Sequence, residues 1–132
     1  LYTKEEMKMI DETKKIMSDD SLRITATTVR VPVYRSHAES VNVEFADEVS
    51  VEAAKKAIAA FPGAQVKDNP AEMEYPMPLF TSGKNDVEVG RIRKDYSVDH
   101  GLNFWVCGDQ IRKGAALNAL QIAEYMIAKN MF

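Results

Sequence analysis

The sequence lacks most features that mark extracellular, membrane-spanning or nucleic-acid-binding proteins. Its one cysteine, Cys107, cannot form a disulfide within the chain. No apolar run approaches the roughly 18–20 residues that cross a bilayer, and the charged start of the chain lacks the apolar core of a signal peptide. The net charge is only -3, and no block of lysine or arginine stands out as a surface for nucleic acid. We therefore expect a cytoplasmic protein that acts on neither membranes nor nucleic acids.

Metal-ligand patterns are missing as well. No group of histidine, cysteine, aspartate and glutamate residues has the spacing of a metal-ligand set, so we expect no metal site. The rest of the composition is ordinary for a globular protein, since 45% of the residues are apolar. The chain has 132 residues, which is enough for one compact domain with a sizeable core.

Hydrophobic periodicity and turn residues predict an alternation of helices and strands. Thr3 and Glu6 have the spacing of a capping box, and β-branched residues mark a long strand with a bulge near residues 27–28. In chain order we expect a helix over 3–17, strands over 22–34 and 41–45, a helix over 50–61, a short strand over 64–67, strands over 87–94 and 102–107, and a helix over 113–130. The short connections predict an α+β fold, with a mixed, largely antiparallel sheet and helices on one face.

The last predicted helix is unusually apolar. Asn118, Gln121 and Glu124 leave it only a narrow polar strip, whereas a helix packed on one layer usually keeps a broad polar face. The chain also begins without a methionine. We therefore expect a fragment of a longer protein, in which the final helix packs against a part that is absent here.

Three segments resemble a known enzyme family. They are residues 5–8 (EEMK) with 12–16 (ETKKI), residues 29–41 (VRVPVYRSHAESV), and residues 89–95 (VGRIRKD) with 112–119 (RKGAALNA). In this order they resemble the C-terminal part of the aspartate-semialdehyde dehydrogenases. RVPV-x-R-x-H together with RKGAALNA is a specific signal, although neither motif would suffice alone. The chain departs from the family at Gln110, where asparagine is usual, so we transfer no role to that residue.

The resemblance implies a fold like the C-terminal domain of glyceraldehyde-3-phosphate dehydrogenase. Residues 1–132 would form the substrate-binding and dimerisation domain, and 113–131 would pack on an absent nucleotide domain. The complete enzyme would be an NADP-dependent oxidoreductase of lysine, threonine and methionine biosynthesis, forming a homodimer or homotetramer. It would interconvert L-aspartyl 4-phosphate and L-aspartate 4-semialdehyde with phosphate. A cysteine thiolate outside this chain would attack the acyl carbon, and NADPH would reduce the thioester.

The resemblance also implies roles for two residues of the second segment. Arg30 would bind the substrate carboxylate, because a guanidinium can donate two parallel hydrogen bonds to it. His37 would be the catalytic acid and base, because an imidazole can accept and donate a proton near neutral pH. Without the resemblance, Arg30 would be interpreted as a surface ion-pair partner and His37 as an exposed turn residue.

Glu5 and Lys8 are three residues apart and share one face of the first predicted helix. The resemblance implies that Glu5 binds the substrate ammonium and Lys8 its phosphate. An ordinary surface ion pair is the alternative, and Glu6 is an alternative to Glu5. The capping role predicted for Glu6 favours Glu5 as the residue left free for substrate. The cofactor-binding residues are unknown from this chain.

Cys107 is rejected as the nucleophile, because a cysteine in an apolar strand is usually a small buried hydrophobe. Arg35, Glu39, Arg91 and Arg93 are interpreted as structural or interface residues. The chain has neither the nucleophile segment nor a glycine-rich nucleotide loop, so we expect it to be inactive alone. Two other interpretations stay open. One is the related N-acetyl-glutamyl-phosphate reductase, and the other is a non-catalytic dimerisation or ligand-binding module.

Overall fold

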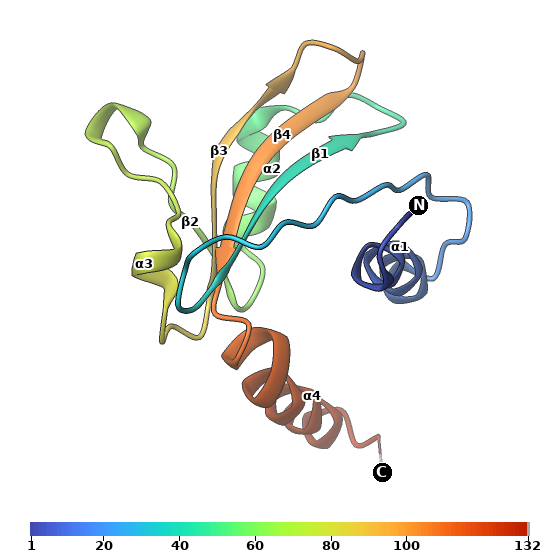
Figure 1. Ribbon diagram of the computed structural model, residues 1–132, viewed down its shortest axis with the longest axis vertical. Helices are drawn as coiled ribbons and strands as arrows, with labels where there is room; N and C mark the ends of the chain where they lie inside the picture. Colours follow the sequence, from blue (N-terminus) through green and yellow to red (C-terminus); the bar gives the residue numbers. More distant parts are fainter. Residues whose placement is uncertain (132) are drawn as a thin grey trace. The chain divides into compact units, whose positions relative to one another are not determined.

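The chain divides into two units, Leu1–Pro32 and Val33–Phe132. The first unit contains helix α1 (Lys4–Met17) and the extended segment that follows it (Figure 1). The computed structural model describes residues 1–131. The predicted capping box is present. Thr3 Oγ1 accepts from the Glu6 N–H at 3.2 Å, and Glu6 Oε2 accepts from the Thr3 N–H at 2.8 Å. Two otherwise unpaired amides at the helix start are thereby satisfied, so the helix begins where the sequence predicts.

The strand predicted over 22–34 is wrong. The segment after α1 follows an extended course in Figure 1, and every second residue from Leu22 to Thr28 is half-buried, but no strand forms over residues 22–30. The segment is instead tied to α1, because the Thr28 N–H donates to Glu6 Oε1 at 2.9 Å. Alternation reports an extended backbone with two unlike faces, whereas a strand also needs a neighbouring strand with which to pair. The first unit contains a helix and offers no such neighbour among the described residues.

The second unit is built on a four-stranded sheet in the order β1-β4-β3-β2 (Figure 1). The strands are β1 (His37–Glu44), β2 (Ala64–Val66), β3 (Val87–Asp95) and β4 (Gly101–Gly108). β4 pairs antiparallel with β1 and β3, whereas β2 pairs parallel with β3. The predicted α+β fold with a mixed, largely antiparallel sheet is therefore confirmed. β1 begins four residues before the strand predicted over 41–45, at His37.

Helix α2 (Val51–Ala59) packs on the sheet beside β2 and β3. As predicted, Ser50 caps it, with Oγ accepting from the Ala53 N–H at 3.1 Å. On the way to β3, the chain passes through the short helices η1 (Pro70–Glu72) and α3 (Pro78–Thr81). This segment lies so close to the sheet that a Cβ at Gly90 would overlap the carbonyl oxygen of Lys67. Position 90 therefore requires glycine.

The final helix begins with one irregular turn, η2 (Arg112–Ala116), and continues as α4 (Leu117–Ala128). Ala115 departs from helical dihedral angles, with φ −143° and ψ −107°. Figure 1 shows α4 leading away from the sheet. Its apolar side chains are largely exposed, including Leu120 (57%), Ile122 (54%) and Ile127 (64%). Across residues 1–131, no helix has the length and apolar character needed to cross a membrane.

Asp95 at the end of β3 makes the stability sensitive to acid. Its carboxylate accepts from the Ser97 hydroxyl and N–H and from Asn42 Nδ2, which together lower its pKa to about 2. The stabilisation is complete above the unfolded-state pKa of about 3.9 and is lost as the pH falls through the folded-state value. We expect the thermal midpoint to fall between pH 5 and pH 2, and to fall less in Asp95→Asn. Equal acid sensitivity of the variant and the wild type would contradict this assignment.

Candidate active site

His37 is the first residue of β1, where it pairs with Gly108 at the end of β4. Its side chain is exposed, and within its own unit no hydrogen bond or ion pair to another described residue holds the imidazole. The position of the ring therefore depends on the backbone around residue 37. An exposed imidazole at a strand end is well suited to exchange a proton with a ligand or with water.

Ser36, directly before His37, is fixed on both its backbone and its side chain. It is only 2% exposed and has φ +76°, a left-handed conformation that is uncommon for serine. Its N–H donates to Gln110 Oε1 at 2.9 Å, and its Oγ accepts from Thr81 Oγ1 at 3.0 Å. Thr81 is itself fully buried. These bonds hold the entry into β1 in a conformation that the local sequence would not favour.

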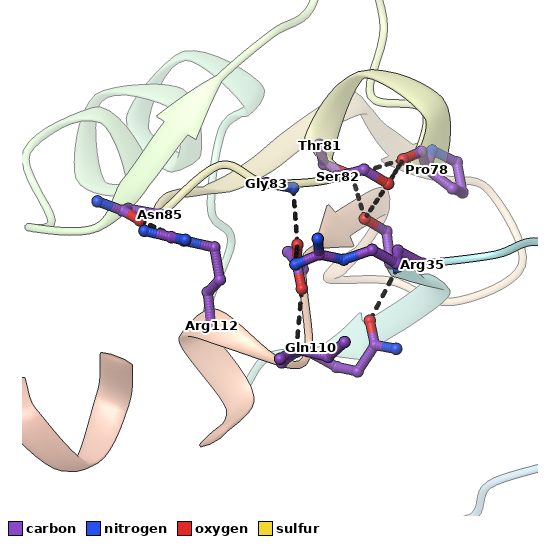
Figure 2. A network of polar contacts seen from close by, with 11 residues as sticks. Arg35, Pro78, Thr81, Ser82, Gly83, Asn85, Gln110 and Arg112 are labelled. Carbon is purple, nitrogen blue, oxygen red and sulfur yellow. Dashed lines mark hydrogen bonds and ion pairs between the residues drawn. The ribbon is translucent and has the colours of Figure 1, made fainter. Parts of the chain in front are cut away.

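Asp109 is a buried anion that joins three parts of the chain. Figure 2 shows the surrounding network of polar contacts, with Arg35, Gly83 and Gln110 labelled. Its Oδ2 accepts from the Gly83 N–H at 2.7 Å and lies 2.6 Å from Arg35 Nη2, and its Oδ1 accepts from the Ile111 N–H at 3.0 Å. The Gly83 amide, aided by the Ile111 amide and the Arg35 charge, lowers the pKa of Asp109. A fully buried carboxylate persists as an anion because it is paired and hydrogen-bonded in this way.

Sequence reasoning missed this network, which brings together residues 35–36, 81–83 and 109–112. The sequence indicates only a structural or interface role for Arg35 and no role for Gln110. The sequence signal that could have revealed the network is Asp109, close to the motif RKGAALNA. A charged residue that directly follows an apolar strand is a candidate for a buried polar contact. Nothing in the spacing of the three segments, however, reveals that they meet.

The other three predicted site residues lie in the first unit. Arg30 is exposed in the extended segment after α1. Glu5 and Lys8 are exposed on α1 and form the ion pair expected of their spacing, with Lys8 Nζ 3.3 Å from Glu5 Oε2. Both carboxylate oxygens of Glu6 are occupied by Thr3 and Thr28, so Glu6 has a structural role and Glu5 is the freer acid. The roles that the resemblance implies would require these residues to meet His37 around one substrate, and this stays a prediction.

Cys107 is completely buried in β4, and burial raises the pKa of its thiol to about 11. The side chain is therefore a neutral thiol at pH 7–8, where a nucleophile would need to be a thiolate. We expect an aromatic disulfide reagent to leave Cys107 unlabelled in the folded protein and to label it fully in denaturant. Rapid labelling under native conditions would contradict this inert role.

Within residues 1–131, no three histidine, cysteine, aspartate or glutamate side chains are grouped so that they could hold a metal ion.

Comparison with known proteins gives this arrangement a family. The family model described as the semialdehyde dehydrogenase dimerisation domain matches residues 1–113. The chain belongs to the semialdehyde dehydrogenase dimerisation-domain family. Among relatives of this dimerisation domain, the aspartate-semialdehyde dehydrogenase of Synechocystis sp. is 55% identical over 128 residues, covering 97% of this chain and 38% of that protein. The Aquifex aeolicus enzyme is 49% identical over 130 residues, covering 98% and 38%. The chain therefore spans about two fifths of these relatives.

Solved structures support the same assignment of fold and family. Aspartate semialdehyde dehydrogenase II of Vibrio cholerae, crystallised in complex with ASA, aligns with a TM-score of 0.90 at 42% identity, covering 96% of this chain and 37% of that one. The Candida albicans enzyme, crystallised with NADP, aligns with a TM-score of 0.79 at 27% identity, covering 100% and 44%. The dimerisation domain described here thus has the α+β fold of C-terminal domains in this enzyme family.

Proposed function

We propose that the chain is the substrate-binding and dimerisation part of an NADP-dependent aspartate-semialdehyde dehydrogenase. The complete enzyme would interconvert L-aspartyl 4-phosphate and L-aspartate 4-semialdehyde with phosphate, in the cytoplasm, as a homodimer or homotetramer. The observation that carries the proposal is 55% identity over 97% of the chain to an enzyme of that name. The exposed His37 at a rigid strand end is the structural feature that agrees with it.

In the proposed reaction, His37 accepts the proton of the attacking thiol and later returns a proton to the oxygen of the reaction intermediate. Arg30 binds the substrate α-carboxylate through two parallel hydrogen bonds, which fix its orientation as well as balance its charge. Glu5 binds the α-ammonium and Lys8 the phosphate. In this proposal substrate replaces the present Glu5–Lys8 ion pair, which is weak because both groups are solvated.

Two connections that lead from a strand into a helix are poorly suited to the phosphates of NADP. The connection from β1 to α2, residues 45–50, contains no glycine, and Glu52 in the first turn of α2 would repel a phosphate. The connection after β4 holds the anionic Asp109. We therefore assign the binding of NADP mainly to a nucleotide domain outside this chain, and with it the nucleophilic cysteine.

The related N-acetyl-glutamyl-phosphate reductase is the second candidate. Its substrate carries an acylated amino group, so a carboxylate for an ammonium would have no purpose there. Glu5 is exposed and only loosely paired, as an ammonium ligand should be, and this favours the aspartyl substrate. A module without catalytic function is the third candidate, and it would need neither Arg30 nor His37 for its activity.

A comparison of substrates tests the proposal. The complete protein is assayed with L-aspartate 4-semialdehyde, phosphate and NADP, in parallel with N-acetyl-glutamate semialdehyde, and the isolated 132-residue chain is the control. We expect turnover of the aspartyl substrate by the complete protein and none by the isolated chain. Preference for the N-acetylated substrate, or no turnover by the complete protein, would refute the proposal.

The proposal includes a role for the final helix, 113–131, as a surface for the nucleotide domain. Its exposed apolar side chains, such as Leu120 and Ile127, would be covered there. We expect amides of α4 to exchange hydrogen much faster in the isolated chain than in the complete protein, whereas amides of β4 exchange slowly in both. Equal protection of α4 in both proteins would contradict this packing.

A further inference from the structure

Among the described residues of its unit, backbone contacts rather than a side-chain partner hold the imidazole proposed to move protons. β1 pairing fixes one side of His37 through Gly108, and the buried Ser36 fixes the other. Ser36 is held through its N–H by Gln110 and through its hydroxyl by Thr81. A proton transfer needs its two heavy atoms within about 3 Å, so a small shift of this backbone would carry the ring out of reach.

Asp109 restrains both neighbours of this turn. Arg35, directly before Ser36, lies 2.6 Å from the Asp109 carboxylate through Nη2. Gly83, two residues after Thr81, donates its N–H to the same oxygen at 2.7 Å. One carboxylate oxygen thus anchors the chain entering β1 and the segment that contacts Ser36 from the other side. These two groups act only as donors, which requires an acceptor at both lone pairs of that oxygen.

We propose that Asp109 is a positioning residue for His37, acting through Arg35, Ser36 and the Thr81–Gly83 segment. The inference rests on the proposed function, in which His37 is the acid and base. Asp109 itself touches neither substrate nor cofactor in this account. Its contribution is to hold the His37 backbone within about 0.5 Å of the productive position.

The first test is Asp109→Asn in the complete enzyme. An asparagine has one acceptor oxygen in place of two. Its NH2 group would face either the Ile111 N–H or both the Gly83 N–H and the Arg35 guanidinium, donor against donor. We expect kcat to fall about 10- to 100-fold with little change in KM, because the substrate ligands are untouched. The matched control is Asp95→Asn, another buried carboxylate with a lowered pKa, at the opposite end of β3 and β4, which should leave kcat near the wild-type value.

A double-mutant cycle separates positioning from general damage. If Asp109 acts through His37, then adding Asp109→Asn to His37→Asn costs no further activity, and the two losses are not multiplied. If Asp109 merely stabilises the fold, the losses multiply. Crystals of the Asp109→Asn enzyme should show the His37 Cα displaced by about 0.5 Å or more relative to β4, a result that does not depend on activity.

A second pair of variants covers the case in which Asp109→Asn does not fold. Thr81→Val is nearly isosteric but cannot donate to Ser36, whereas Thr81→Ser keeps the hydroxyl. We expect Thr81→Val to lower kcat about fivefold at unchanged KM, and Thr81→Ser to restore most of it. The inference would be overturned if Thr81→Val and Thr81→Ser had equal kcat values and His37 were not displaced in the Asp109→Asn or Thr81→Val enzyme.

The outcomes also distinguish the two levels of proposal. If the wild-type protein has no turnover with the aspartyl substrate, the proposed function fails and the inference fails with it. The positioning role alone is refuted if the wild type is active and His37→Asn is impaired, but the Asp109 and Thr81 variants keep full activity. It is also refuted if the losses of the Asp109 and Thr81 variants multiply with the loss caused by His37→Asn.

Discussion

Asparagine in place of His37 is expected to lower kcat of the complete enzyme by about 10²- to 10⁴-fold, which is the usual contribution of a positioned general acid and base. Binding should be nearly unaffected, because the proposed substrate ligands are Arg30, Glu5 and Lys8. Steady-state kinetics that separate kcat from KM give the measurement. The side chain is exposed and the β1 backbone bonds remain, so the variant should fold normally.

The control for this substitution is His100→Asn, which changes the second histidine of the chain, located in the turn before β4. It should keep kcat near the wild-type value. Comparable losses in both variants would show that the effect of His37→Asn is not chemical. A wild-type rate for His37→Asn would remove His37 from the mechanism altogether.

Lysine in place of Arg30 is expected to reduce kcat/KM by about 10- to 100-fold, even though the charge is kept. Only a guanidinium can donate two parallel hydrogen bonds to the substrate carboxylate, and one bond to a charged group contributes about 1.5–3 kcal/mol. The specificity constants of the two enzymes for L-aspartate 4-semialdehyde are compared. Because Arg30 is exposed, the substitution should not destabilise the fold, so a lower stability would not explain the fall in kcat/KM.

Arg23→Lys is the matched control, since Arg23 is an exposed arginine in the same extended segment. Its specificity constant should stay close to that of the wild type. An Arg30→Lys enzyme that is as efficient as the control would refute the carboxylate role and leave Arg30 as a surface residue.

Local signals in the sequence predicted the elements whose ends are set by local bonds. The capping box of α1 and the Ser50 cap of α2 need only neighbours three residues away, and both were found. The hairpin of β3 and β4 was also predicted, because alternation and a polar turn coincide there. These features are decided within a few residues, so a single sequence contains the information.

Features decided by distant parts of the chain were not predicted. Alternation predicts a strand over 22–34, but it does not show whether a pairing partner exists, and no strand forms over residues 22–30. β1 was predicted to begin at Val41, because the exposed residues before it show no apolar alternation, although they pair fully with β4. The Asp109 network joins residues separated by 26 and 74 positions in its hydrogen bonds, which no spacing rule covers.

Glu5 and Glu6 are chemically identical neighbours on the first turn of α1, yet selection for folding alone should constrain only Glu6. Both oxygens of Glu6 are bonded, one to the helix start and one to Thr28, so a shorter or uncharged side chain would loosen the segment that carries Arg30. Among the described residues, Glu5 forms its ion pair with solvated Lys8, so a protein with almost any residue at position 5 should still fold. A variant library sorted for soluble expression would therefore tolerate change at position 5 and reject it at position 6. Under the proposed function, the same library could also be selected in host cells that depend on this enzyme and grow without added lysine, threonine and methionine. This selection would constrain both positions.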